Sequence, residues 1–255
     1  MTVSPPGRET VLGKALLILA AFTVDETSLS FAGLQQRTCL AKATLHRMLG
    51  DLVGAGLLDR VDGSYRLSRF VFELGMRASV ERGLLEVAIP FLEDLYERTH
   101  ETVHLGVREG TEVVYVAKMG GHQQAASPSR LGGRMPLHAT AIGKALLAHA
   151  PADVLESALR GRLERFAPRT ITAPGVLRRQ LDTVLEKGVA FEYEESAVGI
   201  VCVSAPIFDR DDSVVAAVSV TGPVTRFQPS RHAASVHAAA AGIAATLARR
   251  DALRA

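Results

Sequence analysis

A run of predicted helices that ends in a short hairpin constrains the fold of this chain more than any other feature of its sequence. Residues 10–22 are rich in alanine and leucine and predict a first, buried helix. Ser30 can cap a shorter second helix over 31–38 by accepting a backbone N–H from the first turn. A third helix is expected over 41–56, after a short turn.

The third helix has one apolar face and several polar sides. Its apolar residues recur at three- and four-residue spacing, as in a helix packed on a core: Leu45, Met48, Leu49 and Leu52. Two short strands are then expected around Asp62-Gly63, a pair that accepts the positive φ angles of a tight hairpin. Helix, short helix, turn, polar-faced helix and hairpin in this order predict a winged helix-turn-helix.

The basic residues of this region favour DNA as its partner. The chain carries a formal net charge of only +2, but the stretch from Arg37 to Arg69 holds six basic and three acidic residues. Such an excess alone is equally typical of an ordinary solvated surface, and the complete order of elements is what favours DNA. The expected major-groove contacts on the helix are Lys42, Thr44, His46 and Arg47, and the expected phosphate contacts on the hairpin are Arg60 and Arg66.

Residues 69–100 show helical spacing of apolar side chains and lead into a second domain. Gly75 and Gly83 are expected to interrupt this helical region, and Pro90 can open a fresh turn. The expected parts of the chain are a winged helix-turn-helix DNA-binding domain over 8–69, a linker helix over 70–82, and an effector-binding domain over 83–255.

The second domain opens with strict alternation of apolar and polar residues. Residues 102–119 predict two strands about a Glu109-Gly110 turn, and further strands are expected within 189–195, 199–209 and 213–223. Helices are expected over 230–250 and after Pro174, where one apolar face would hold Leu177, Leu181, Val184 and Leu185. Strands in hairpins, with helices mostly before and after them, predict an α+β domain around an antiparallel sheet.

The stretch "RMPLHATAIGKALLAHA", from Arg134 to Ala150, concentrates polar groups ahead of an apolar helix. A phosphate-binding loop needs Gly, four residues and then Gly-Lys-Ser/Thr. Here Gly143-Lys144 is followed by Ala145, and the first glycine is replaced by His138. The sequence therefore excludes such a loop.

Catalysis and metal binding are not favoured either. The candidate nucleophiles Thr140, Ser204 and Cys202 come with no Gly-x-Ser-x-Gly elbow and no evident base. The candidate metal ligands fall on separate predicted elements without ligand spacing, which is more typical of structural histidines: His104, His122, His138 and Cys202. We expect no catalytic residue, metal or cofactor.

The start of the predicted helix over 140–150 suits an anion better. Thr140 can cap this helix, and Gly143 would let a small ligand approach its backbone. The free N–H groups and partial positive charge of a helix N-terminus attract carboxylates. Lys144 is expected to point away from the ligand and to serve a surface or interface pair. The stretch thus favours a receptor for a small organic acid.

Three segments of the chain resemble the signatures of IclR-type (isocitrate lyase regulator) transcription factors. They are "TCLAKATLHRMLGDLVGAGLLDRVDGSYRLS", "MPLHATAIGKALLA" and "YEESAVGIVCVSAPIFDRDDSVVAAVSVTGP". The resemblance implies a winged helix-turn-helix, a linker helix, a GAF-like effector-binding domain, dimers or dimers of dimers, and control of catabolic operons by small metabolites. By motif position it places the ligand at Ala141, Ile142, Glu192, Ile200, Cys202, Ser219 and Thr221.

The chain departs from the family pattern in two places. The family's turn reads Thr-Gly-Leu-Pro-Lys-Ser-Thr, whereas here Cys39 replaces the glycine suited to a left-handed turn and Ala43 replaces a hydroxyl that could touch DNA. In the expected pocket, Ala141 and Ile142 are bulkier than the residues of glyoxylate-type receptors, which disfavours a two-carbon acid.

The function these features favour is a ligand-responsive DNA-binding transcription regulator, a repressor by the habit of the family. The alternative is a small-molecule-binding or hydrolytic enzyme with a helical N-terminal dimerisation domain, which would need neither a basic third helix nor a wing. Because one winged domain makes few DNA contacts, we expect a palindromic operator and a homodimer or dimer of dimers.

Several absences in the sequence favour a cytoplasmic protein without a membrane partner. No apolar run approaches the ~20 residues of a membrane span, and the first residues lack an export pattern. Cys39 and Cys202 lie far apart in the chain and suggest reduced thiols.

Overall fold

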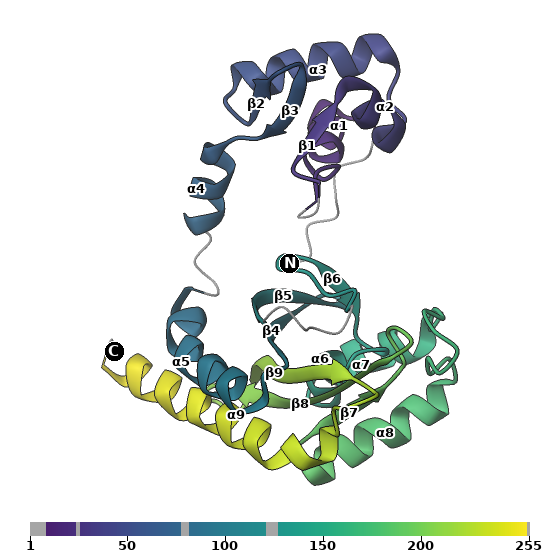
Figure 1. The fold of residues 1–255 in the computed structure, drawn as a ribbon. Helices are drawn as coiled ribbons and strands as arrows, with labels where there is room; N and C mark the ends of the chain where they lie inside the picture. Colours follow the sequence, from purple (N-terminus) through teal and green to yellow (C-terminus); the bar gives the residue numbers. More distant parts are fainter. Residues whose placement is uncertain (1–8, 24–25, 78–81, 121–126, 254–255) are drawn as a thin grey trace. The chain divides into compact units, whose positions relative to one another are not determined.

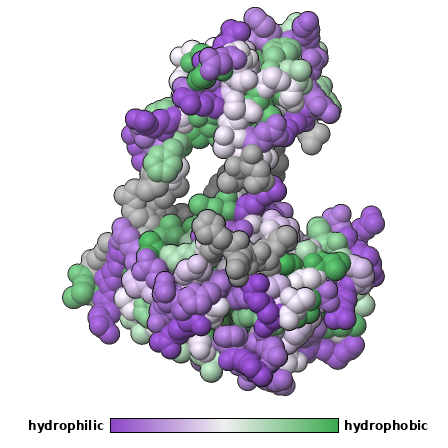
Figure 2. All heavy atoms as spheres, in the orientation of Figure 1, coloured by the Kyte–Doolittle hydropathy of each residue, from purple (hydrophilic) through white to green (hydrophobic). Residues whose placement is uncertain are grey.

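The computed structural model describes residues 9–23, 26–77, 82–120 and 127–253, and it divides into two compact units, Met1–Ser79 and Val80–Ala255 (Figure 1). Hydrophilic residues cover much of the visible face of each unit, with smaller hydrophobic groups among them (Figure 2). Among the described helices, none combines the length and apolar character that crossing a bilayer requires.

The N-terminal unit is a winged helix-turn-helix. Its elements are α1 (Val11–Leu19), β1 (Ser28–Ser30), α2 (Phe31–Thr38), α3 (Lys42–Gly54), β2 (Leu58–Val61), β3 (Ser64–Leu67) and α4 (Arg69–Arg77). The strands form an antiparallel sheet in the order β1-β3-β2. Ser30 caps α2 as expected, because its Oγ accepts the Gly33 N–H at 3.1 Å. The apolar face of α3 is buried with Ile18 and Leu34 in one core.

Two features of this unit differ from the sequence prediction. The first helix is not buried all round, since Leu12 and Leu16 are 62% and 45% exposed. This exposure could not be predicted, because a segment made mostly of alanine and leucine has no polar residues that would mark its exposed face. Strand β1 was not predicted, because three residues are too few to show an alternating pattern.

The C-terminal unit has helices on both faces of one antiparallel sheet. Its elements are α5 (Arg82–Thr99), β4 (Thr102–Glu109), β5 (Glu112–Met119), β6 (Arg134–Pro136), α6 (Ala141–Ala148), α7 (Ala152–Arg160), α8 (Pro174–Lys187), β7 (Ala190–Tyr193), β8 (Ile200–Phe208), β9 (Val214–Pro223) and α9 (Pro229–Ala252). The strand order is β6-β5-β4-β9-β8-β7. The expected α+β fold around an antiparallel sheet is confirmed.

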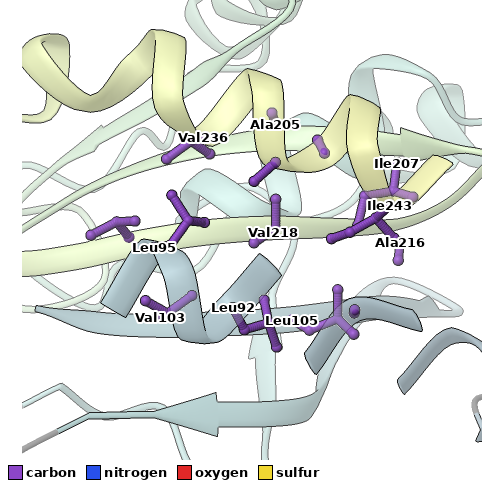
Figure 3. Packing of buried hydrophobic residues seen from close by; sticks show 14 of the residues in the cluster. Leu92, Leu95, Val103, Leu105, Ala205, Ile207, Ala216, Val218, Val236 and Ile243 are labelled. Carbon is purple, nitrogen blue, oxygen red and sulfur yellow. The ribbon is translucent and has the colours of Figure 1, made fainter. Parts of the chain in front are cut away.

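Alternation along the strands gives the two faces different chemistry. One set, which includes Val103, Leu105 and Val218, packs with Leu95 of α5 and Val236 of α9 in the larger core (Figure 3). The other set packs with α6 and α8 and contains smaller and polar residues. The second face therefore has room for a site.

The helical region after the wing differs in detail from its prediction. Gly75 lies inside α4 and Gly83 inside α5, so neither interrupts a helix. Pro90 does not open a turn but lies on an exposed side of α5, where water can satisfy the carbonyl it leaves free. Residues 78–81 of the expected linker helix lie outside the described residues. On α8, Leu185 is 53% exposed rather than part of the packed face.

Candidate functional site

Helix α3 presents the polar surface expected of a recognition helix. Lys42, His46 and Arg47 are exposed and Thr44 is half-buried, whereas the apolar face is buried. No side chain caps the start of α3, where Ala41 is the N-cap, so its first N–H groups and partial positive charge remain available to a phosphate. These contacts with DNA remain predictions.

The turn before α3 needs a left-handed residue. Cys39 ends α2 with φ of 54° and ψ of 22°, and its N–H bonds the Gln35 carbonyl at 2.9 Å. A glycine would adopt this conformation without the steric cost that a Cβ adds. The left-handed turn is therefore kept here, although Cys39 stands where its conformation favours glycine.

The wing holds its two predicted arginines at the surface. Asp62 and Gly63 have φ of 51° and 79°, as a tight hairpin requires. Arg66 pairs with Asp59 across the strands at 3.2 Å, and the Arg60 guanidinium lies 5.8 Å from the centre of the Tyr65 ring. An exposed pair of this kind is weak, so Arg66 can exchange its partner for a phosphate.

A pocket on the α6 face of the sheet brings together eight of the nine predicted effector residues. Its cavity volume is only about 10 Å³, about the room that one water molecule needs. The predicted residues that line it are Thr140, Ala141, Ile142, Glu192, Ile200, Cys202, Ser219 and Thr221. Their role toward a ligand remains a prediction, but they form one site.

Gly143 does not line this pocket, and its expected role is wrong. A Cβ on this residue would lie 2.2 Å from the Leu137 carbonyl oxygen and 2.5 Å from the Leu137 Cα. The glycine therefore allows α6 to pack closely against the backbone of Leu137, in the segment that precedes the helix, and this contact leaves no space for a ligand.

Strand register gathers the polar side chains of the pocket. Thr221 of β9 lies opposite Cys202 of β8, which in turn lies opposite Glu192 of β7. Ser219 lies opposite His104 of β4. Directly opposed residues project to the same face of a sheet, so distant segments supply one polar row.

The N-terminus of α6 supplies hydrogen-bond donors to the same pocket. Thr140 Oγ1 accepts the Gly143 N–H at 3.0 Å and donates to the Pro136 carbonyl at 3.1 Å. The N–H groups of Ala141 and Ile142 have no hydrogen-bond partner among the described residues. An anion at this position would satisfy both donors and meet the positive end of the helix.

Burial sets the charge of the titratable pocket residues. Burial raises the pKa of Glu192 to about 7, although Ser196 donates its N–H to Oε1 at 2.9 Å and its hydroxyl to the same oxygen. Burial and nearby Lys118 lower the pKa of His104 to about 3. Burial raises the pKa of Cys202 to about 12. Near neutral pH, His104 and Cys202 are uncharged and Glu192 titrates.

Lys144 is not at the surface, contrary to its sequence prediction. Its side chain is 1% exposed, and Nζ donates to Glu195 Oε1 at 2.7 Å and to Gln180 Oε1 at 2.8 Å. The residue does point away from the pocket. It fixes α6 to α8 and to the segment after β7.

The geometry gives no nucleophile or metal site among the described residues. Thr140 is used as a cap, and Ser204 Oγ donates to the Val218 carbonyl at 2.8 Å. His138 bonds the Glu164 carbonyl at 2.9 Å. Within the described part of the chain no cluster of histidine, cysteine and carboxylate side chains could hold a metal; His122 lies outside that part.

Sequence reasoning missed several pocket residues, and one of them left a signal. His104 was interpreted as a structural histidine, yet it stands at an alternating position of its strand, where a polar residue marks a face that is not part of the main core. Tyr115, Ser129 and Ser196 also line the pocket, and only the fold brings them there.

Comparison with known proteins gives matches along most of the chain. The family model "Bacterial transcriptional regulator IclR C-terminal" matches residues 76–247, and "IclR helix-turn-helix domain" matches residues 11–62. The chain is 34% identical to the HTH-type transcriptional regulator KdgR of Escherichia coli (strain K12), over 89% of each chain. It is 32% identical to the HTH-type transcriptional repressor AllR of Klebsiella pneumoniae, over 86% of this chain and 82% of that protein.

Solved structures agree with these matches. An IclR homologue from Microbacterium hydrocarbonoxydans, crystallised with 4-hydroxybenzoate, is 31% identical and has a TM-score of 0.86. The similarity covers 94% of this chain and 100% of that one.

Proposed function

The chain belongs to the IclR family of bacterial transcriptional regulators, and on that premise we propose that it represses a catabolic operon until a small organic acid binds its C-terminal unit. Its relatives are named transcriptional regulators, so the chain is a DNA-binding regulator and not an enzyme. A regulator that binds bacterial DNA would work in the cytoplasm.

The single observation that carries the choice of ligand is the N-terminus of α6. The free N–H groups of Ala141 and Ile142 line one buried pocket with the hydroxyls of Ser219 and Thr221. The two free N–H groups suit a carboxylate, because hydrogen bonds to an ionised acceptor are strong in a partly dry site. The Thr221 hydroxyl donates to Cys202 Sγ at 3.0 Å and would have to turn from this partner to meet the carboxylate. The relative crystallised with 4-hydroxybenzoate carries a ligand of this class, which supports the assignment.

On the DNA side, α3 would enter the major groove and the wing would touch the backbone. One winged domain makes few contacts, so a homodimer or dimer of dimers on a palindromic operator would supply the affinity. The acid would bind one arrangement of this assembly more tightly than another and thereby shift their populations.

Calorimetry tests the ligand assignment. The panel of acids is benzoate, 4-hydroxybenzoate, butyrate, 4-hydroxybutyrate, hexanoate and 6-hydroxyhexanoate. Each acid is titrated into the wild-type protein and into the double variant Ser219→Ala with Thr221→Val. We expect at least one acid to bind the wild type and to lose about tenfold or more in affinity in the double variant. Ser213→Ala removes an exposed hydroxyl from the β8–β9 turn and serves as the control. Equal affinity in the double variant would place the carboxylate elsewhere.

A further inference from the structure

The pocket at the start of α6 is closed in the structure, and a much larger groove lies next to it. The pocket has a volume of about 10 Å³, whereas small-molecule sites usually enclose about 300–1,000 Å³. The neighbouring groove has a cavity volume of about 460 Å³ and is lined by β6, the C-terminal part of α7 and the segment 161–166. An acid can therefore bind in the pocket only after a part of its wall has moved.

Met135 of β6 is the wall that the two cavities share. It lines both of them, and no other described residue does so. Its side chain is half-buried, stands opposite Val113 of β5, and packs against the core beneath α6. A methionine side chain is unbranched and turns about three bonds at little cost, so it can leave this position without a shift of the backbone.

The other walls of the pocket are held more firmly. Ser129 of the loop before β6 is tied to the sheet, because its Oγ lies 2.7 Å from His104 Nε2 and its carbonyl accepts from Lys118 Nζ at 2.8 Å. The start of α6 is fixed by the close approach of Gly143 to Leu137. Most of the remaining lining residues belong to strands of the hydrogen-bonded sheet. Moving the side chain of Met135 is therefore the least costly way to open the pocket.

The groove suits the apolar end of an acid. Its lining includes Leu137, which is 2% exposed, together with Leu163 and Phe166. The Phe166 ring is 45% exposed and lies 5.9 Å from the ring of His138, so a ligand in the groove would cover more of its apolar surface. The arginines and glutamates of the lining balance in charge, which favours an uncharged end: Arg134, Arg162, Glu112 and Glu164.

We propose that Met135 is a gate between the pocket and the groove, and that the apolar end of the bound acid passes this gate and occupies the groove. The inference rests on the proposed function, because it assumes that the carboxylate lies at the N-terminus of α6. Only residues 137–140 separate β6 from α6, so the gate and the carboxylate lie on adjoining segments. Met135 would then set the rate of acid binding, and the groove would select for the length of the acid.

The groove is tested by calorimetry with acids of different length. In the wild type, hexanoate should bind about tenfold more tightly than butyrate, because each methylene buried in the groove contributes about fourfold in affinity. Ser157→Phe adds a large side chain to the lining of the groove and none to that of the pocket. It should lower the affinity for hexanoate to that for butyrate and leave butyrate unchanged. Ser230→Phe, at an exposed position of α9 outside both cavities, is the control and should keep the wild-type ratio.

The gate is tested by association rates. Stopped-flow tyrosine fluorescence can follow binding, since Tyr115 lines the pocket and the chain has no tryptophan. Met135→Ala removes the gate and should raise the association rate constant of hexanoate about tenfold. Met135→Ile keeps an apolar side chain but stiffens it next to the backbone, and it should slow association by a similar factor. Met119→Ala, which lies outside both cavities, should leave the rate unchanged.

The outcomes that would overturn the inference differ from those that would overturn the proposed function. Equal association rates in the wild type and both Met135 variants would mean that the acid enters elsewhere. Equal affinity for butyrate and hexanoate in the wild type, or an undiminished ratio in Ser157→Phe, would mean that the groove stays empty. Failure of every acid to bind would overturn the proposed function as well. If Ser157→Phe does not fold by circular dichroism, Leu163→Ala should lower the same ratio by removing apolar lining from the groove.

Discussion

At the scale of single residues, we expect Glu192 to make binding of the proposed acid depend on pH. Its carboxyl is buried between Lys144, Glu195 and Ser196, and its pKa is about 7. A bound carboxylate nearby raises that pKa further, so binding takes up a proton above about pH 7 and little below it. We expect the dissociation constant to rise by up to about tenfold per pH unit above neutrality. Calorimetry in buffers of different ionisation enthalpy measures the proton uptake.

Glu192→Gln is the matched control, because it keeps the shape and the hydrogen bond from Ser196 but cannot titrate. It should bind acid with the same affinity on either side of neutrality. The folded pKa lies above the ordinary 4.5, so ionisation of Glu192 destabilises the wild type as pH rises from about 4.5 to 7. The variant should therefore gain stability relative to wild type across this window. Proton uptake by the variant equal to that of the wild type would contradict the assignment.

Cys39 offers a second test at this scale, in the N-terminal unit. Its left-handed conformation costs a residue with a Cβ roughly 1 kcal/mol. Cys39→Gly should raise the free energy of unfolding by about that amount, as measured by urea denaturation. Cys39→Ala removes the thiol but keeps the Cβ, and it should bring no gain. A gain of similar size in Cys39→Ala would point to the thiol instead of the backbone.

At the scale of elements, the buried ion pair of Lys144 and Glu195 holds helix α6, whose N-terminus lines the candidate effector pocket. Lys144→Met would leave Glu195, 4% exposed, without its cation, and Glu195 Oε2 already has no hydrogen-bond partner among the described residues. We expect a loss of about 3–5 kcal/mol in the free energy of unfolding. Lys187→Met, at the exposed end of α8, should change it little. Restoring most of the loss with Glu195→Gln in the Lys144→Met background would confirm that the uncompensated charge is the cause.

Helices and strands were predictable where one sequence pattern extended over many residues. The segments "IVCVSAPIF" and "VVAAVSVTGP" are long runs rich in valine and isoleucine, which are typical of strands, and the structure places strands at Ile200–Phe208 and Val214–Pro223. Strand β6 and helix α7 escaped prediction, since β6 has three residues and α7 followed no obvious start signal. The pocket was located through its helix cap and the family resemblance. The buried state of Lys144 depends on Glu195 and Gln180, 51 and 36 residues away, which local patterns do not show.

At the scale of the whole molecule, DNA binding should require two half-sites. Gel shifts with the DNA upstream of the gene should show a sharp loss of affinity when either half of the palindrome is scrambled, and light scattering should find a dimer or tetramer. Arg47→Ala should weaken specific binding by about 1–3 kcal/mol if its side chain reads a base. Arg210→Ala, an exposed arginine of the C-terminal unit, is the control. A monomer with full operator affinity would contradict the symmetric arrangement.

Linkage provides the last prediction, because it connects the two units without any assumption about how they are arranged. If an acid lowers the affinity for operator DNA by some factor, operator DNA must lower the affinity for that acid by the same factor. We therefore expect the acid's dissociation constant to rise in saturating operator DNA, typically by about 5- to 150-fold. Arg47→Ala should bind the free acid as wild type does, since the substitution lies outside the acid-binding unit. Unchanged acid affinity with bound operator would mean that the acid occupies its pocket without regulating DNA binding.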